Sequence, residues 1–406
     1  MPQQMFQLLS QVTPFILQQN SCIKHLLQLQ ASANQGIIGP LKFLADHTES
    51  FLLHKDNANT CVAGFGPLLF QLVTADSSSM QTRVAALYLM RVLVAHADAH
   101  ATTAMMPPWL ELCCVSMKRP LPQVTLDELM LRISGSRMLL MLSEYTSKYK
   151  ELMTTERQAI LVAAWDAAAA VQQHVQAIIN GSAFDDAVCC DDDEGSVSVM
   201  ACAVQNIELL KAVCICKNKA VQAVVQQALG QVMGLLVQCS VLTQDQQQEI
   251  YADTDTLLDE DNQCTLRTTA LDAVLSLCGT PGGKVKRHGV EHLRQAFMQA
   301  IATSQQQQQH GDPRWWMLLE AALACIDRVG TELDFAVFSF GEVAEVVRTA
   351  MNSDAPLLAA RALQVCASFA DERAVSAGRG ISKEHIVPLL SVAVQRTSHA
   401  RACVLL

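Results

Sequence analysis

The chain has 406 residues and a net charge of −10, and half of its residues are hydrophobic while only 5% are aromatic. This length exceeds one ordinary core, so the chain holds several domains or one elongated array. The acidic balance argues against a nucleic-acid binder, which would show a basic face, and disfavours an anionic membrane surface. An excess of Ala, Leu, Val, Met and Gln predicts an all-α chain.

Apolar residues recur with a helical period along the whole chain, and turn signals separate the stretches. We expect helices over residues 5–29, 37–53, 66–73, 80–97, 109–117, 126–149, 155–179, 197–216, 220–238, 265–277, 290–304, 314–329, 340–351, 356–369 and 382–394. The pair Pro107-Pro108 should end one helix and begin the next. The run Asn180-Gly181-Ser182 should end another helix.

The predicted helices pair at a spacing of roughly 40 residues, which lies inside the range of HEAT-type repeats. The expected architecture is therefore a HEAT-repeat-like α-solenoid, a superhelix of antiparallel helix pairs. A large irregular helical domain is the alternative. We expect one continuous solenoid in three stretches, residues 1–180, residues 181–264 with two acidic loops, and residues 265–406.

Acidic residues gather in two places. One group falls within nine residues and directly precedes a predicted helix: Asp253, Asp255, Asp259, Glu260 and Asp261. The other group falls within the connection of residues 182–196: Asp191, Asp192, Asp193 and Glu194. Acids packed this closely repel one another, so we expect exposed loops or helix caps that suit a cationic partner. An ordinary solvated loop is the alternative.

Candidate metal ligands lack the spacing of a metal site. The 15 cysteines include no CxxC pair, and most lie singly in apolar helical stretches, as Cys325 and Cys366 do. They are expected to be small buried hydrophobes in a reducing compartment. His96 and His100 are four residues apart and could share a metal, but no third ligand lies nearby. We expect no metal and no cofactor.

No catalytic motif is present among the phosphate-loop, dinucleotide-binding, zinc-protease and nucleophile-elbow patterns. The acidic groups also lack the apolar surroundings that separate the pKa values of paired carboxyls. The sequence therefore predicts a protein that is not an enzyme.

The chain ends with Cys403-Val404-Leu405-Leu406, which fits the prenylation pattern. A single lipid chain anchors a protein only marginally, and no polybasic run accompanies the cysteine. No signal peptide or membrane-spanning segment is evident. We expect no stable membrane association, and a membrane-tethered adaptor is a further hypothesis.

Three segments resemble the importin-β (karyopherin-β) family of nuclear transport receptors, and within it the branch of importin-nine type. The first is the acidic stretch followed by a helix that carries Arg267, Ala270 and Asp272. The second is the Trp315-Trp316 pair followed by Glu320-Ala321, and the third is Arg361-Ala362 followed by Ser368 and Phe369. They occur in the order in which the family has them.

The resemblance implies a nuclear transport receptor that binds basic protein cargo, such as histones or ribosomal proteins, for Ran-dependent nuclear import. It implies that the partners are Ran-GTP and nucleoporins, that the chain shuttles between cytoplasm and nucleus, and that the acidic loops contact the cargo. We expect Trp315 and Trp316 to pack in the core and cap one repeat, and Arg361 to bond neighbouring carbonyls.

The sequence also departs from the family. Family members are longer, and their N-terminal Ran-binding region is not recognisable near Met1. We therefore expect a partial chain. A Ran-independent helical scaffold or chaperone for basic proteins is the alternative function.

Overall fold

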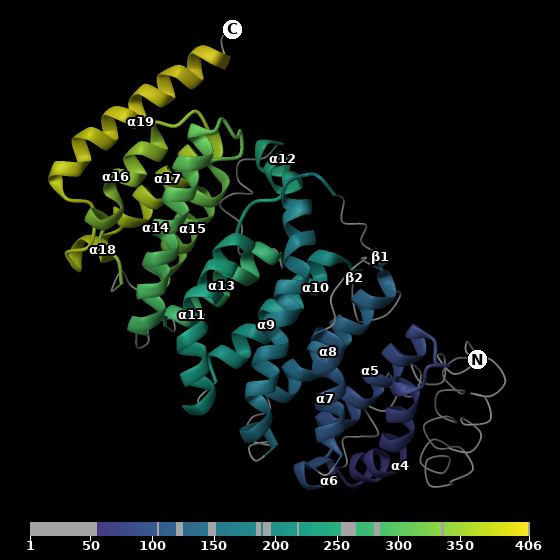
Figure 1. Ribbon diagram of the computed structural model, residues 1–406. Helices are drawn as coiled ribbons and strands as arrows, with labels where there is room; N and C mark the ends of the chain where they lie inside the picture. The colour runs from purple at the N-terminus through teal and green to yellow at the C-terminus, as the bar shows by residue number, and fades with distance from the viewer. Residues whose placement is uncertain are drawn as a thin grey trace, which may run out of the picture. The chain divides into compact units, whose positions relative to one another are not determined.

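The computed structural model describes residues 55–103, 105–118, 125–144, 152–183, 188–189, 196–216, 219–252, 265–279, 285–333 and 337–404. These residues form 16 helices that pack on one another and one pair of two-residue strands (Figure 1). The predicted all-α class is confirmed for this part of the chain. The regular repeat of a solenoid stays a prediction, and the helices expected at residues 5–29 and 37–53 lie outside the described residues.

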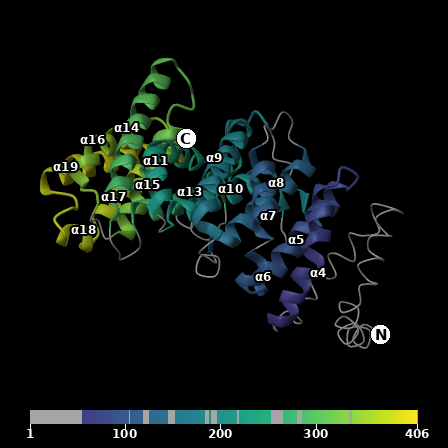
Figure 2. The same ribbon diagram turned by 60° about the horizontal axis from the view of Figure 1, so that its bottom comes forward.

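The chain divides into two compact units. Unit 1 comprises Met1–Gln173 and Asp185–Val221. Its elements are α4 (Lys55–Thr74), α5 (Met80–His96), α6 (Ala99–Thr103), α7 (Met106–Lys118), α8 (Leu126–Glu144), most of α9 (Leu152–Ile179), β1 (Val188–Cys189), β2 (Ser196–Val197) and α10 (Val199–Cys214). Helices α5, α8 and α10 pack in a row, with α4 against α5 and α7 against α8 (Figure 2).

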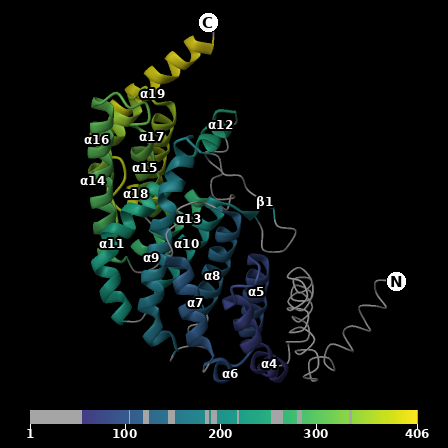
Figure 3. The same cartoon turned by 45° about the vertical axis from the view of Figure 1, so that its right-hand side comes forward.

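Unit 2 comprises His174–Phe184 and Gln222–Leu406. Its elements are most of α11 (Lys219–Cys239), α12 (Gln244–Ala252), α13 (Leu266–Cys278), α14 (Arg287–Gln309), α15 (Met317–Glu332), α16 (Phe340–Met351), α17 (Pro356–Phe369), α18 (Glu372–Ser376) and α19 (Lys383–Val404). Helices α13, α15 and α17 form a row. Helix α14 packs on α13 and α15, and α16 packs on α17 and α19 (Figure 3).

Helix α13 shows how local sequence and packing agree. Its predicted apolar stripe is buried along its length: Leu266, Ala270, Val274 and Leu277. Thr265 caps its first turn, because the Thr265 hydroxyl accepts a hydrogen bond from the Thr268 N–H at 3.2 Å and the Thr268 hydroxyl accepts one from the Thr265 N–H at 3.0 Å. This reciprocal pair satisfies two N–H groups that a helix end leaves unbonded.

Helix α9 ends where the sequence predicts. Gly181 has a positive φ of 67°, a conformation that glycine adopts readily. A Cβ at this position would lie 2.1 Å from the Gln244 Oε1 atom of α12, but that atom is the end of a side chain that can rotate away. The backbone conformation is therefore the reason that this turn favours glycine.

Some elements differ from the predictions. Helix α12 falls in a stretch for which the sequence predicted no helix; it is rich in Gln, and its only buried residue is Ile250. Trp315 and Trp316 precede α15 rather than lying in it, and Trp316 is its N-cap. Helix α4 begins at Lys55, eleven residues before the helix that the sequence predicts at residues 66–73.

Helix α11 is the one described helix long and apolar enough to cross a membrane by length and composition. Its apolar stretch has 44% of its residues buried inside the protein. Its exposed positions include Gln226, Gln227, Gln231 and Gln238. An apolar helix that packs one face and exposes glutamines on the other has the pattern of a core helix.

Candidate functional site

The nine acidic residues predicted to contact cargo all lie outside the described residues. They are Asp191, Asp192, Asp193, Glu194, Asp253, Asp255, Asp259, Glu260 and Asp261. The structure does describe the residues on either side of each group. Strands β1 and β2 flank the first group and pair antiparallel, with Val188 opposite Val197. Ala252, the last residue of α12, and Thr265, the N-cap of α13, flank the second.

Helix α12 is held by a small apolar cluster. Ile250 packs with Leu242 and with Leu357 at the start of α17, and Trp316 and Ala360 pack against these three residues. The cluster fixes the residues that precede the second acidic group beside the N-terminal ends of α15 and α17. Trp316 therefore has the packing part of its expected role, although it is only partly buried and its side chain makes no capping hydrogen bond.

The row of α13, α15 and α17 contains a buried ionic cluster. The Arg267 guanidinium of α13 donates two parallel hydrogen bonds to the Glu320 carboxylate of α15, at 2.9 and 2.8 Å. The Arg361 Nε of α17 donates to the same carboxylate at 2.9 Å. All three side chains are nearly inaccessible to solvent, at 1–3% exposure. We call these three residues the Arg-Glu-Arg cluster.

Neighbouring groups satisfy further donors of the two arginines. Arg361 Nη1 donates to the Gln364 side-chain oxygen at 2.6 Å. Arg267 also donates to the backbone oxygen of Ser240, which follows the last turn of α11. A cation at the end of a helix interacts favourably with the carbonyls and the dipole there. Arg267 thus joins three helices rather than two.

The cluster carries one negative and two positive charges. Burial alone would raise the pKa of Glu320, but the Arg267 and Arg361 guanidiniums outweigh that effect and hold the pKa below its usual range. Glu320 is therefore ionised at neutral pH. Removing one partner from a buried ion pair costs about 3–5 kcal/mol because a charge is left uncompensated. Glu320 is the only acid in the cluster, so its loss would leave two such charges.

The cluster unites the three segments on which the family resemblance depends. Arg267 comes from the first segment, Glu320 from the second and Arg361 from the third, at sequence separations of 53 and 41 residues. Arg361 was expected to bond neighbouring carbonyls; its Nε and Nη1 atoms donate to the side-chain oxygens of Glu320 and Gln364. Carbonyls of its own helix are already engaged in the helical ladder.

Other residues of the same segments also lie between the helices. Asp272 accepts a hydrogen bond from Arg328 of α15 at 2.8 Å, at the half-exposed edge of the α13–α15 contact. Ala270 and Ala362 are fully buried. Phe369 packs against Phe340 of α16, with ring centroids 5.8 Å apart. The segments therefore hold helices together, which is a structural role.

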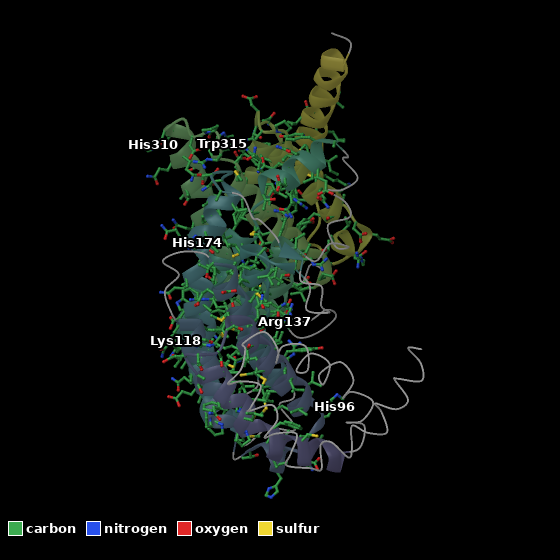
Figure 4. The ribbon with its side chains drawn as sticks, turned by 90° about the vertical axis from the view of Figure 1, so that its right-hand side faces the viewer. His96, Lys118, Arg137, His174, His310 and Trp315 are labelled. Atoms are coloured by element: carbon green, nitrogen blue, oxygen red, sulfur yellow. The ribbon has the colours of Figure 1, made fainter. Side chains whose placement is uncertain are left out.

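A groove of about 570 Å³ opens at the surface of unit 2, between the end of α14, the second half of α16 and the start of α17. Trp315 lines it, and Figure 4 shows this residue beside the end of α14 that carries His310. This groove has no counterpart in the sequence-based predictions. The one sequence feature that pointed to it is the tryptophan pair: Trp316 packs against the α12 cluster, while Trp315 lines the groove.

The cysteines and histidines do not form a metal centre in the described part of the chain. Of the ten cysteines whose side chains are described, eight are buried, as predicted. Burial raises the pKa of Cys202, Cys239 and Cys325 to about 12, so these thiols stay protonated at neutral pH. His96 ends α5 while His100 lies in α6, and the two are therefore not one turn apart on a single helix.

Comparison of the sequence with models of known families and with curated proteins finds no match. The resemblance therefore depends on the three segments described above.

Proposed function

We propose that this chain belongs to a nuclear transport receptor of the importin-β family, near the importin-nine branch. Its cargo would be basic proteins such as histones or ribosomal proteins, carried into the nucleus under the control of Ran-GTP. The receptor would shuttle between cytoplasm and nucleus and would contact nucleoporins. It performs no catalysis in this proposal.

The observation that carries the proposal is the Arg-Glu-Arg cluster. Short motifs that matched a family by chance would have no reason to touch one another in three dimensions. Here each of the three segments contributes one charged residue to a single buried contact. This supports the interpretation that the segments belong to a real helical array, in which they join successive helices.

Charge supports the choice of cargo. The chain carries a net charge of −10, and nine acids fall in two short segments. Exposed ion pairs contribute only about 0–1 kcal/mol each, so such acids act together. Their collective field would steer a basic protein toward the receptor and compete with nucleic acid for it.

The acidic segment can be tested by removing its charge. We would replace the five acids of residues 253–261 with their amides and measure binding of a core-histone dimer over a range of salt concentrations. The expected result is weaker binding with a shallower salt dependence. The matched control replaces five exposed acids elsewhere, with an equal change in net charge: Asp76, Glu111, Asp127, Glu372 and Glu384. Equal losses in both variants would contradict a specific role for the segment.

Dependence on Ran separates the proposal from its alternative. Histone-loaded protein would be captured on beads and washed with Ran locked in its GTP form or in its GDP form. A transport receptor should release the histone with the GTP form only. Retention under both conditions would favour a Ran-independent scaffold or chaperone for basic proteins.

A further inference from the structure

Asn180, which follows the last residue of α9, differs from the other asparagines whose side chains the structure describes. It is exposed, and its side chain has no hydrogen bond to any residue in the described part of the chain. Asn59 exchanges two hydrogen bonds with Asp98, at 3.0 and 2.7 Å. Asn352 donates to the carbonyl one turn earlier in its helix at 2.9 Å, and Asn206 is fully buried. Of these four asparagines, Asn180 alone has a side chain that can turn toward its own backbone.

Asn180 is also the only one of the four that precedes a glycine. The others precede Thr60, Ile207 and Ser353. A side chain on the following residue hinders the approach of that residue's backbone nitrogen to the asparagine side-chain carbon, and a β-branched side chain is bulkiest at that point. Gly181 has no side chain. The reaction between an asparagine side chain and the next backbone nitrogen is therefore least hindered at this pair.

The end of α9 holds both residues in a Schellman motif, a common way for helices to end. The Gly181 N–H donates to the Ile178 carbonyl, and the Ser182 N–H donates to the Ala177 carbonyl, both at 2.9 Å. Gly181 has the positive φ of 67° that this motif requires. The Gly181 nitrogen must leave Ile178 before it can react, so the closed motif slows a reaction at this nitrogen. Because helix ends open at a small cost in free energy, the slow reaction still proceeds.

We propose that Asn180 and Gly181 form a site of spontaneous deamidation, which reacts when the end of α9 opens. Hydroxide takes the proton of the Gly181 N–H, and the nitrogen then attacks the Cγ atom of Asn180. A bond forms between these two atoms, and the bond from Cγ to the side-chain nitrogen breaks. Ammonia leaves after taking a proton from water, which returns the hydroxide. The product is a five-membered succinimide ring.

Water then opens the succinimide. Its addition to one ring carbonyl gives aspartate at position 180, and its addition to the other gives isoaspartate, in which the main chain continues through the side-chain carbon. The net change is the loss of ammonia and the gain of water, and no atom of the protein is oxidised or reduced. The site lies outside both acidic segments, so this inference does not depend on the proposed function.

Both products alter the end of α9. Each adds a carboxylate at the C-terminal end of a helix, where the helix dipole disfavours an anion. Isoaspartate also adds one carbon to the backbone between positions 180 and 181, so the Ser182 N–H no longer meets the Ala177 carbonyl in the same geometry. The Gln244 side chain of α12 lies against Gly181, so the change extends to the first turn of α12. We expect residues 177–183 to open more often in the modified chain.

Peptide mapping by mass spectrometry tests the site in the full chain. The protein would be kept folded in mildly alkaline buffer for several weeks, with samples mapped at intervals. Asn180 should deamidate about tenfold or more faster than Asn59, Asn206 and Asn352, which serve as controls within the same sample. Asn180 and Asn352 are both exposed, so similar rates at these two residues would overturn the proposal.

The Gly181→Asn variant tests the importance of the missing side chain. After glycine, asparagine is the residue that most readily takes the left-handed conformation at a helix end, so the motif should persist. Deamidation at Asn180 should slow by about tenfold, because the new side chain hinders the nitrogen. Circular dichroism verifies that the variant is folded. An unchanged rate at Asn180 in the folded variant would overturn the proposal.

Unfolding the wild-type chain in urea tests whether opening of the helix end controls the rate. The unfolded chain should deamidate at Asn180 about tenfold or more faster than the folded chain, because Ile178 no longer holds the Gly181 nitrogen. Equal rates in the two states would contradict control by the end of α9.

Hydrogen exchange measures the effect of the modification on α9. Anion exchange separates the modified chain, which carries one additional negative charge, from the unmodified chain. Exchange at residues 177–183 should be about two- to fivefold faster in the modified chain. The Asn180→Asp variant adds the charge without lengthening the backbone, so it should show a smaller increase than the isoaspartate form. Equal exchange in all three forms would overturn the expected effect on the helix end.

Discussion

The two units differ in the buried polar contact that joins the helices of each row. In unit 1 the polar contact between neighbouring helices of the row is neutral. The Ser136 hydroxyl of α8 donates to the Asn206 side-chain oxygen of α10 at 2.8 Å, and both side chains are fully buried. In unit 2 the corresponding contact is the Arg-Glu-Arg cluster, which joins three helices through full charges.

Each unit also buries an arginine that bonds the end of a preceding helix. Arg132 of α8 donates to the Met117 carbonyl of α7 at 2.9 Å, and Arg267 of α13 donates to the Ser240 carbonyl after α11. Arg132 has its carboxylate partner, Glu128, within its own helix at 3.2 Å. The carboxylate partner of Arg267 comes from another helix. Both arginines hydrogen-bond a carbonyl of a preceding helix, but only Arg267 also forms an ion pair with another helix, because its acid lies in α15.

The largest effect should come from Glu320→Ala, which leaves two buried arginines without an acid. We expect a loss of about 3–5 kcal/mol of unfolding free energy, because each uncompensated charge must be solvated or expelled. Urea unfolding followed by tryptophan fluorescence measures it. The matched control on the same helix is Glu332→Ala, a half-exposed acid that should cost no more than about 0.5 kcal/mol. Similar losses in the two variants would contradict the cluster's role.

Acid should weaken the two rows differently. The pKa of Glu320 is lowered on folding, so its contribution to stability is complete above the pKa that it has in the unfolded chain. It is lost as the pH falls through the lower folded-state pKa. Neither the Ser136 hydroxyl nor the Asn206 amide is protonated in this pH range, so acid leaves their hydrogen bond unchanged. We therefore expect hydrogen exchange in α15 to accelerate with acid more than in α8, after correction for intrinsic rates. Parallel acceleration would contradict this.

The neutral contact of unit 1 should matter less. Replacing Ser136 with alanine leaves the buried Asn206 oxygen without its donor, at a cost of about 1–3 kcal/mol. The control is Ser134→Ala on the same helix, because the buried Ser134 hydroxyl has no hydrogen-bond partner among the described residues. That variant should be neutral or slightly more stable. Thermal unfolding compares the two, and an equal shift in Tm would argue that the Ser136–Asn206 bond contributes nothing.

The smallest effect is expected at the edge of the α13–α15 contact. Asp272 is about half exposed and pairs with Arg328, so water screens the interaction. The Asp272→Asn variant should lose about 0–1 kcal/mol of unfolding free energy. High salt should reduce the difference from the wild type still further. A loss as large as that of Glu320→Ala would mean that charge at this edge is as important as charge in the buried cluster.

Much of the helical framework could be predicted from local signals. The helix predicted at residues 356–369 matches α17 at both ends, because Pro356 suits the first helical position and the apolar period continues to Phe369. Helix α12 was missed because it buries only Ile250 and shows no apolar period. Where one apolar side chain holds an element, periodicity cannot reveal it.

The contacts of the site were less predictable. Arg267, Glu320 and Arg361 were each singled out in the sequence, but that they meet depends on how α13, α15 and α17 pack. The groove was missed altogether because its lining comes from α14, from α16 and from the turn between α16 and α17, and these residues carry no periodic signal. The nine predicted acids lie outside the described residues, so their role stays a prediction.

The Arg-Glu-Arg cluster constrains how this chain can change over time. Replacing Glu320 alone strands two positive charges inside the protein, while replacing all three residues with apolar ones of similar volume could be harmless. Loss of the acid on its own is thus blocked although the triple replacement is not. We therefore expect the Arg-Glu-Arg cluster to be retained while surface residues around it are substituted. A search for distant relatives that requires Arg, Glu and Arg at spacings near 53 and 41 residues would therefore reach further than overall sequence similarity.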